Sequence, residues 1–122
     1  MIAFLPIREK QLVQSLAQKE GVSASFGYAV FENDAPAAYI LYEICGEEGV
    51  LVCIGGEYDR LIAEGLIRAV FSSLYDANIS RARFLDGIPG ELTRSLGITK
   101  DDSRVVESIA DVLFHCGCEK CH

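Results

Sequence analysis

The sequence predicts a single α/β (α+β) domain in which a mixed β-sheet packs against helices. The chain has 122 residues and half of them are hydrophobic, so it is long enough for one packed core and too short for two. In the first half, three apolar segments rich in β-branched and aromatic residues are separated by turn signals. After residue 56 the apolar residues recur at helical spacing, and a further apolar segment follows. This order predicts a sheet whose strands are joined partly by hairpins and partly by a crossover helix.

The N-terminal half is expected to contain a strand, a helix and a meander. Ile2–Leu5 is a short apolar segment ended by Pro6, which predicts the first strand. Arg8–Glu20 has apolar residues on one face and Gly21 just past its end, which predicts a helix. We expect three antiparallel strands after it, joined at Asn33-Asp34 and at Gly46–Gly49: Phe26–Glu32, Ala37–Cys45 and Val50–Ile54.

The C-terminal half is expected to begin with a long amphipathic helix over Asp59–Ala77. The next strand, Arg81–Leu85, must then return parallel to Val50–Ile54 through a right-handed crossover. The remaining expected elements are a short helix over Glu91–Leu96 closed by Gly97, a strand at Arg104–Glu107, and a helix from Ser108 to Phe114 that Gly117 can end.

Charge and composition exclude several classes of protein. The chain has 18 acidic and 11 basic residues, a formal charge of −7, and no basic stripe, so nucleic acid is not an expected partner. No apolar run approaches ~18 residues, so no membrane span is expected. The N-terminus lacks the pattern of a secretory signal, and the five cysteines are not spread as a disulfide framework would be. We therefore expect a cytoplasmic protein.

The order strand, helix, three-strand meander, long helix, strand and short helix covers roughly residues 1–98. With a glycine-containing bend before the long helix, this order resembles the GNAT superfamily of acetyl-CoA-dependent N-acetyltransferases. The resemblance implies acetyl-CoA as the cofactor and an amine as the acceptor. It also implies that the turn before the long helix presents backbone N–H groups to the pyrophosphate of coenzyme A, for which a helix N-terminus is suited.

The family's loop reads Arg or Gln, two residues, Gly, one residue, then Gly or Ala. Aligned with this pattern, Tyr58 stands at the basic or amide position, Leu61 at the first glycine, and Ala63 satisfies the last position. Gly55 and Gly56 remain as sources of free N–H groups, and Arg60 is the nearby cation.

Two carboxylates stand in the same loop, Glu57 and Asp59. Carboxylates at a helix start stabilise its dipole and would repel a pyrophosphate. We interpret them first as helix-capping residues. The resemblance therefore predicts a degenerate cofactor-binding loop.

Three residues are candidates for catalysis. In the family a tyrosine on the short helix protonates the leaving thiolate, and in ELTRSLGI the residue at that position is Thr93, whose hydroxyl could at best orient a water. Glu43 lies within the apolar run ILYEIC, where desolvation would raise its pKa if it points inward, and Glu57 is the second candidate base. The alternatives are a plain packing helix around Thr93 and ordinary edge or surface carboxylates.

The C-terminal octapeptide HCGCEKCH is the second chemical signal. It supplies thiolate and imidazole ligands of the kind that zinc prefers: His115, Cys116, Cys118, Cys121 and His122. A second copy of the chain could complete such a site and make the metal a dimer staple. A redox-active thiol cluster and a tail that binds nothing are the alternatives. Cys45 and Cys53 lie singly in apolar runs and are expected to be small core residues.

Together these observations predict a GNAT-like domain over residues 1–114 and a Cys/His-rich tail over residues 115–122. The favoured function is a degenerate N-acetyltransferase fold with residual acyl-CoA-dependent transfer to an amine. The alternatives are a non-catalytic module that binds a small molecule or a partner, and a zinc or thiol protein that acts through its tail. The reduced last strand leaves a sheet edge that invites pairing between subunits, so a homodimer is an expected partner arrangement.

Overall fold

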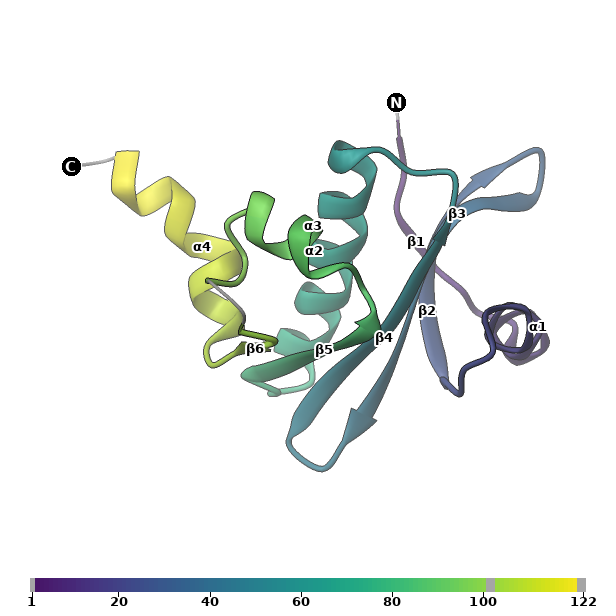
Figure 1. The fold of residues 1–122 in the computed structure, drawn as a ribbon, viewed down its shortest axis with the longest axis horizontal. Coiled ribbons are helices and arrows are strands. Elements are labelled where there is room, and N and C mark those ends of the chain that lie inside the picture. Colours follow the sequence, from purple (N-terminus) through teal and green to yellow (C-terminus); the bar gives the residue numbers. More distant parts are fainter. Residues whose placement is uncertain (1, 101–102, 121–122) are drawn as a thin grey trace.

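A computed structural model describes residues 2–100 and 103–120, the last six as backbone. Within these residues the chain forms a six-stranded sheet in the order β1-β2-β3-β4-β5-β6, with helices on both faces (Figure 1). Neighbouring strands are antiparallel except for the parallel pair β4–β5. The elements are β1 (Leu5–Pro6), α1 (Lys10–Glu20), β2 (Phe26–Glu32), β3 (Ala35–Cys45), β4 (Glu48–Gly56), α2 (Arg60–Asp76), β5 (Arg81–Gly87), α3 (Gly90–Ser95), β6 (Val105–Val106) and α4 (Ile109–Lys120). Over the described part of the chain, none of these helices has the length and hydropathy that a membrane span requires.

The predicted helix α1 is confirmed and covers one face of the sheet. Gly21 ends it in the left-handed conformation (φ 72°), and its N–H is directed at the carbonyls of Ala17 and Gln18. The buried side of α1 packs on the middle strands and forms the smaller of two cores, called here the α1-side core. Its buried members are Val13, Leu16, Ala17, Ala24, Ala29, Tyr39, Leu41, Val50, Val52 and Cys53.

The predicted meander is confirmed: β2 has the expected bounds, and β3 and β4 are longer than expected. The turn between β2 and β3 has positive φ at Asn33 and Asp34, as primed hairpin turns require. β3 begins at Ala35 and so includes Pro36. The register between β2 and β3 shifts beside Pro36, and such an irregularity is where a strand accepts a residue without an N–H.

The other face of the sheet is covered by α2, α3 and α4 (Figure 1). α2 contributes an unbroken apolar stripe to a larger core, called here the α2-side core: Ala63, Leu66, Ile67, Val70, Phe71 and Leu74. The strand residues that point to the α2 face of the sheet complete this core, including Ile40, Leu51 and Phe84. The predicted parallel return of β5 beside β4 is confirmed.

The expected strand at Ile2–Leu5 is wrong in its position, because only Leu5–Pro6 pairs with β2. The segment before it is used for packing on a helix instead. Phe4 lies against Gly65 of α2, where a Cβ would stand 2.0 Å from the Phe4 ring. The missing side chain at Gly65 thus creates the place that Phe4 fills.

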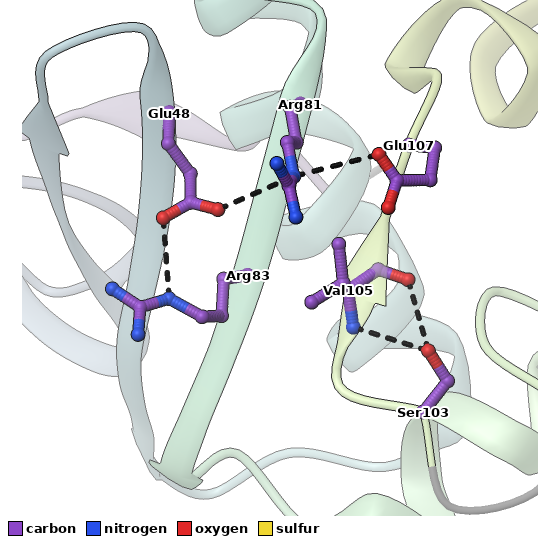
Figure 2. A network of polar contacts seen from close by, with 6 residues as sticks. All are labelled: Glu48, Arg81, Arg83, Ser103, Val105 and Glu107. Atoms are coloured by element: carbon purple, nitrogen blue, oxygen red, sulfur yellow. Dashed lines mark hydrogen bonds and ion pairs between the residues drawn. The ribbon is translucent and has the colours of Figure 1, made fainter.

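Ion pairs link β4, β5 and the end of β6 on the face away from α2 (Figure 2). Glu48 pairs with Arg83 at 3.2 Å and with Arg81 at 3.5 Å, and Arg81 also reaches Glu107 at 3.5 Å. The two arginines are about half exposed, so each pair contributes at most about 1 kcal/mol. Two of the pairs join β4 to β5, and the third connects β5 to the residue that follows β6.

The last helix is longer than predicted. α4 continues from Ile109 through Gly117 to Lys120, so the expectation that Gly117 ends the helix is wrong. A glycine inside a helix costs about 1 kcal/mol and does not by itself stop it. α4 therefore crosses the boundary that the sequence predicts between residues 114 and 115.

Candidate functional site

The two parallel strands separate near the end of β4. Opposite β3, Leu41 pairs with Cys53 and Tyr42 with Leu51, so Val52 is an extra residue and forms a bulge in β4. The β4–β5 pairing reaches its last register position at Cys53 and Gly87. β4 then continues along β3 through Gly56. The ends of β4 and β5 therefore diverge just below the start of α2.

The two glycines of the predicted cofactor loop each have a packing role. Gly55 faces the α1 side, where a Cβ would lie 2.7 Å from the hydroxyl of Tyr39. Gly56 has φ +80°, and a Cβ there would stand 2.3 Å from the carbonyl oxygen of Ala37. The N–H of Glu57 donates to that same carbonyl at 2.7 Å. The two glycines thus allow the end of β4 to pack closely on the Tyr39 side chain and on the backbone of β3 before α2 begins.

The start of α2 is occupied by the chain's own carboxylate. Asp59 is the N-cap, and its Oδ1 accepts from the N–H of Ile62 at 2.8 Å. This confirms the helix-capping interpretation for Asp59. Glu57 is exposed two residues earlier, and Leu61, at the family's first glycine position, is 67% exposed. The N-terminus of α2 therefore presents carboxylates and an isobutyl group.

The remaining residues of the predicted loop are engaged within the protein. Arg60 donates from its guanidinium to the backbone carbonyl of Ser95, which links the first turn of α2 to the end of α3. Tyr58 is half-buried against the α2-side core, and Ala63 is buried within it. The cation that could have balanced a pyrophosphate is thus directed at a carbonyl of α3.

Thr93 lies in the interior and is 0% exposed. Its hydroxyl donates to the carbonyl of Gly90 at 3.0 Å and accepts from the hydroxyl of Thr99 at 2.8 Å. The bond to Gly90 lies within α3 and the bond from Thr99 ties α3 to the loop after it, so both hydrogen-bonding roles of this side chain are used inside the protein. A catalytic role for Thr93 gains no support from this position.

Glu43 does not lie with the loop residues. It pairs with Val50 near the β3–β4 hairpin, whereas the loop follows the opposite end of β4. Its side chain is directed to the α1 face, where its Oε2 accepts from the hydroxyl of Ser25 at 2.8 Å. Glu43 also lines a pocket of about 410 Å³ between the end of α1 and β3. The two carboxylates predicted as candidate bases, Glu43 and Glu57, thus stand at different ends of the sheet.

A polar cluster beneath Gly55 was not anticipated from the sequence. The hydroxyl of Tyr39 donates to the carboxylate of Glu20, the last residue of α1. Burial and this carboxylate raise the pKa of Tyr39, so the phenol stays protonated. Burial first, and then the charge of Glu20, raises the pKa of Cys53 to about 11. In the structure Tyr39 lies opposite Gly55, and the missing side chain of the glycine leaves room for the phenol and the Glu20 carboxylate.

The predicted zinc ligands fall outside what the structure describes in detail. The backbone of His115, Cys116 and Cys118 lies in the last part of α4, while Cys121 and His122 lie outside the described residues. Among the described residues, no group of three or more His, Cys, Asp or Glu side chains is arranged to hold a metal ion. Of the two cysteines expected in the core, Cys53 is buried and Cys45 is exposed, so the expectation is wrong for Cys45, which ends β3.

Comparison with known proteins identifies the fold. No protein-family model and no curated protein matches the chain. Among solved structures it resembles E. coli YhhK, a protein assigned as an N-acetyltransferase and bound to coenzyme A, with a TM-score of 0.60 and 15% identity over 88% of this chain and 98% of that one. It also resembles the ribosomal-protein-S18-alanine N-acetyltransferase of Escherichia coli (TM-score 0.58, 13% identity, 87% and 90% covered). A third similar structure is the PaiA N-acetyltransferase of Thermoplasma acidophilum in complex with coenzyme A. Its TM-score is 0.52 and its sequence identity is 11%, over 79% of this chain and 67% of that one.

These structures define the fold class as that of the GNAT N-acetyltransferases, a mixed sheet with flanking helices. At 11–15% identity the likeness establishes the fold, and activity must be argued from the site.

Proposed function

We propose that this chain is a GNAT-fold domain with a degenerate cofactor loop, which acts as a module binding a small molecule or a partner. Any acyl-CoA-dependent transfer to an amine is residual. The observation that carries the proposal is the carboxylate of Asp59 on the N–H of Ile62, at the helix start where an anionic pyrophosphate would have to be accepted.

The residues present fit coenzyme A only in part. The bulge at Val52 and the divergence of β4 from β5 leave strand edge beside the loop, and the coenzyme A-bound neighbours share this fold. Against this stand Glu57 and Asp59, which repel phosphate, and the Arg60 guanidinium, which is directed at Ser95. At the pyrophosphate end the group does not fit, so we derive no transfer step through it.

Calorimetric titration with acetyl-CoA tests the proposal. We expect no saturable binding at micromolar concentrations for the wild-type chain. The double variant Glu57→Gln/Asp59→Asn removes two negative charges from the loop and should bind acetyl-CoA more tightly. Asp76→Asn, at the far end of α2, makes a similar charge change and should leave binding as in the wild type. Micromolar affinity of the wild type would overturn the proposal and restore an acyltransferase.

The tail predictions have separate tests. Elemental analysis of protein purified without a metal-affinity tag should find roughly stoichiometric zinc if the tail cysteines and histidines form a site. Metal-free protein would contradict the zinc prediction. Sedimentation over a range of protein concentrations tests the predicted homodimer in the same samples.

A further inference from the structure

The pocket beside Glu43 has a chemistry of its own. It is a cavity of about 410 Å³, within the size range of small-molecule sites, and it opens to solvent between the end of α1 and β3. Its apolar lining residues are Ala17, Val22 and Ala24, and polar atoms make up the larger part of its lining surface. Its polar groups are the amides of Gln14 and Gln18, the hydroxyls of Ser23 and Ser25, and the Glu43 carboxylate.

The charge of this pocket is negative. Glu43 is half-buried. The structure describes every residue that lines the pocket, and none of these residues is lysine or arginine. Lys19 lies in the last turn of α1 but does not line the pocket. The segment Val22–Ser25 follows directly on the C-terminus of α1, where the helix dipole adds negative potential. The formal charge of −7 on the whole chain acts in the same direction.

The Glu43 carboxylate is positioned with acceptor capacity to spare. Ser25 donates to Oε2, and the N–H of Ile44 is 3.4 Å from Oε1, at the limit of a hydrogen bond. A carboxylate has about four acceptor positions, so lone pairs remain for a ligand. A single carboxylate is too few ligands for a divalent metal ion, which needs several oxygen or nitrogen donors.

From this geometry we propose that the Glu43 pocket binds a small organic ammonium ion. The ammonium group pairs with Glu43 and donates to the amide and hydroxyl oxygens around it, and its short alkyl chain lies against Ala17, Val22 and Ala24. The inference rests on the proposed role as a binding module and names the chemical class of its ligand. It assigns Glu43 to recognition at a site remote from the start of α2.

Amide NMR titration with n-butylammonium chloride tests this site. We expect saturable shifts confined to the second half of α1, residues 22–25 and the end of β3. The neutral analogue n-butanol and the anion butyrate should not produce them. Added salt should weaken the binding, because the contact is an ion pair near the surface.

Matched variants identify the carboxylate. Glu43→Gln keeps an acceptor for Ser25 but removes the charge, and it should weaken n-butylammonium binding about tenfold or more. Glu47→Gln, in the exposed hairpin three residues before Val50, is the charge-matched control and should bind as the wild type does. Gln18→Lys places a cation beside the pocket at an exposed position of α1, and it should also weaken n-butylammonium binding. This variant tests the site even if Glu43→Gln does not fold.

The proposal is overturned if no saturable shifts occur, if n-butanol produces the same shifts, or if both Glu43→Gln and Gln18→Lys retain wild-type affinity. The acetyl-CoA titration is read separately. Lack of both acetyl-CoA and n-butylammonium binding would reject the ammonium site and leave the degenerate loop standing, whereas micromolar acetyl-CoA binding would reject the degenerate loop alone.

Discussion

The two faces of the sheet differ in what they bury. The α2 face holds the larger core, in which a 17-residue helix packs large aliphatic and aromatic side chains against four strands. The α1 face is covered by an 11-residue helix and has a smaller core with several alanines. The α1 face also carries the titratable groups described above: Glu20, Tyr39, Glu43 and Cys53.

The two faces of the sheet therefore have different roles: the α2 face mainly stabilises the fold, and the α1 face holds the polar groups and the pocket. Large apolar contacts on the α2 face supply most of the burial that holds the fold, at roughly 25 cal/mol per Å² of apolar surface. The α1 face packs fewer large side chains and keeps carboxylates at its rim, where an open pocket remains. A ligand site is easier to accommodate on a face that contributes less to stability.

Core truncation on each face gives the largest expected effect. Phe71→Ala removes a fully buried ring from the α2-side core and should lower the free energy of unfolding by about 3–5 kcal/mol. Leu16→Ala, on the α1 side, should cost about 2 kcal/mol, because Leu16 lies at a less enclosed site. Urea unfolding of both variants measures this. Equal losses would contradict the unequal division of stability between the faces.

The elements of the fold could largely be predicted because periodicity records which face of each segment is buried. The apolar stripe of α2, the aromatic and β-branched residues of β2 and the glycine after α1 are local patterns, and the structure confirms all three elements. The N-terminal segment could not be placed correctly, because Phe4 packs on Gly65, sixty-one positions away. A contact between residues so far apart in the sequence cannot be predicted from local periodicity.

The candidate site was predictable where it depends on local capping and not where it depends on register. Asp59 as an N-cap follows from its position before an apolar helix, and the structure confirms it. The position of Glu43 depends on its pairing with Val50 and on the loop after α1, so the sequence leaves open whether its side chain points inward and does not predict its pocket. The contact between Glu20 and Tyr39 required the packing of α1 across the sheet, which one sequence does not specify.

The pH dependence of the free energy of unfolding tests whether the α1-side core keeps the Cys53 thiol protonated. Its thiol loses a proton near its ordinary pKa of 9.0 in the unfolded chain and near about 11 in the folded one. Between these values the unfolded state binds fewer protons, so stability falls as the pH rises through this window, by about 2 kcal/mol for this group. Cys53→Ala should start from lower stability but lose less of it between pH 9 and pH 11.

Unfolding by urea under reducing conditions at several pH values checks this expectation. If the wild type and Cys53→Ala lose stability in parallel over the window, Cys53 is not held neutral by the α1-side core. The tyrosines contribute to the decline in both proteins, so the difference between the two curves isolates the thiol.

A matched pair of tyrosine variants gives the smallest effect and compares the faces directly. Tyr39→Phe removes a hydroxyl that donates to the Glu20 carboxylate on the α1 side. Tyr28→Phe removes one that donates to the Ser73 hydroxyl at 3.2 Å on the α2 side. Hydrogen bonds to charged groups are the stronger kind, so we expect a loss of about 1.5 kcal/mol for Tyr39→Phe and about 0.5 kcal/mol for Tyr28→Phe.

Thermal and urea unfolding of the two variants measure this difference at neutral pH. A larger loss for Tyr28→Phe would mean that the polar contact on the α2 face is the more important one, and the division between the faces would then fail. The Glu20→Gln variant provides a check, because it keeps an acceptor for Tyr39 but removes its charge. Its loss should fall below that of Tyr39→Phe, since the hydrogen bond persists in neutral form while the solvent-exposed amide needs no other partner.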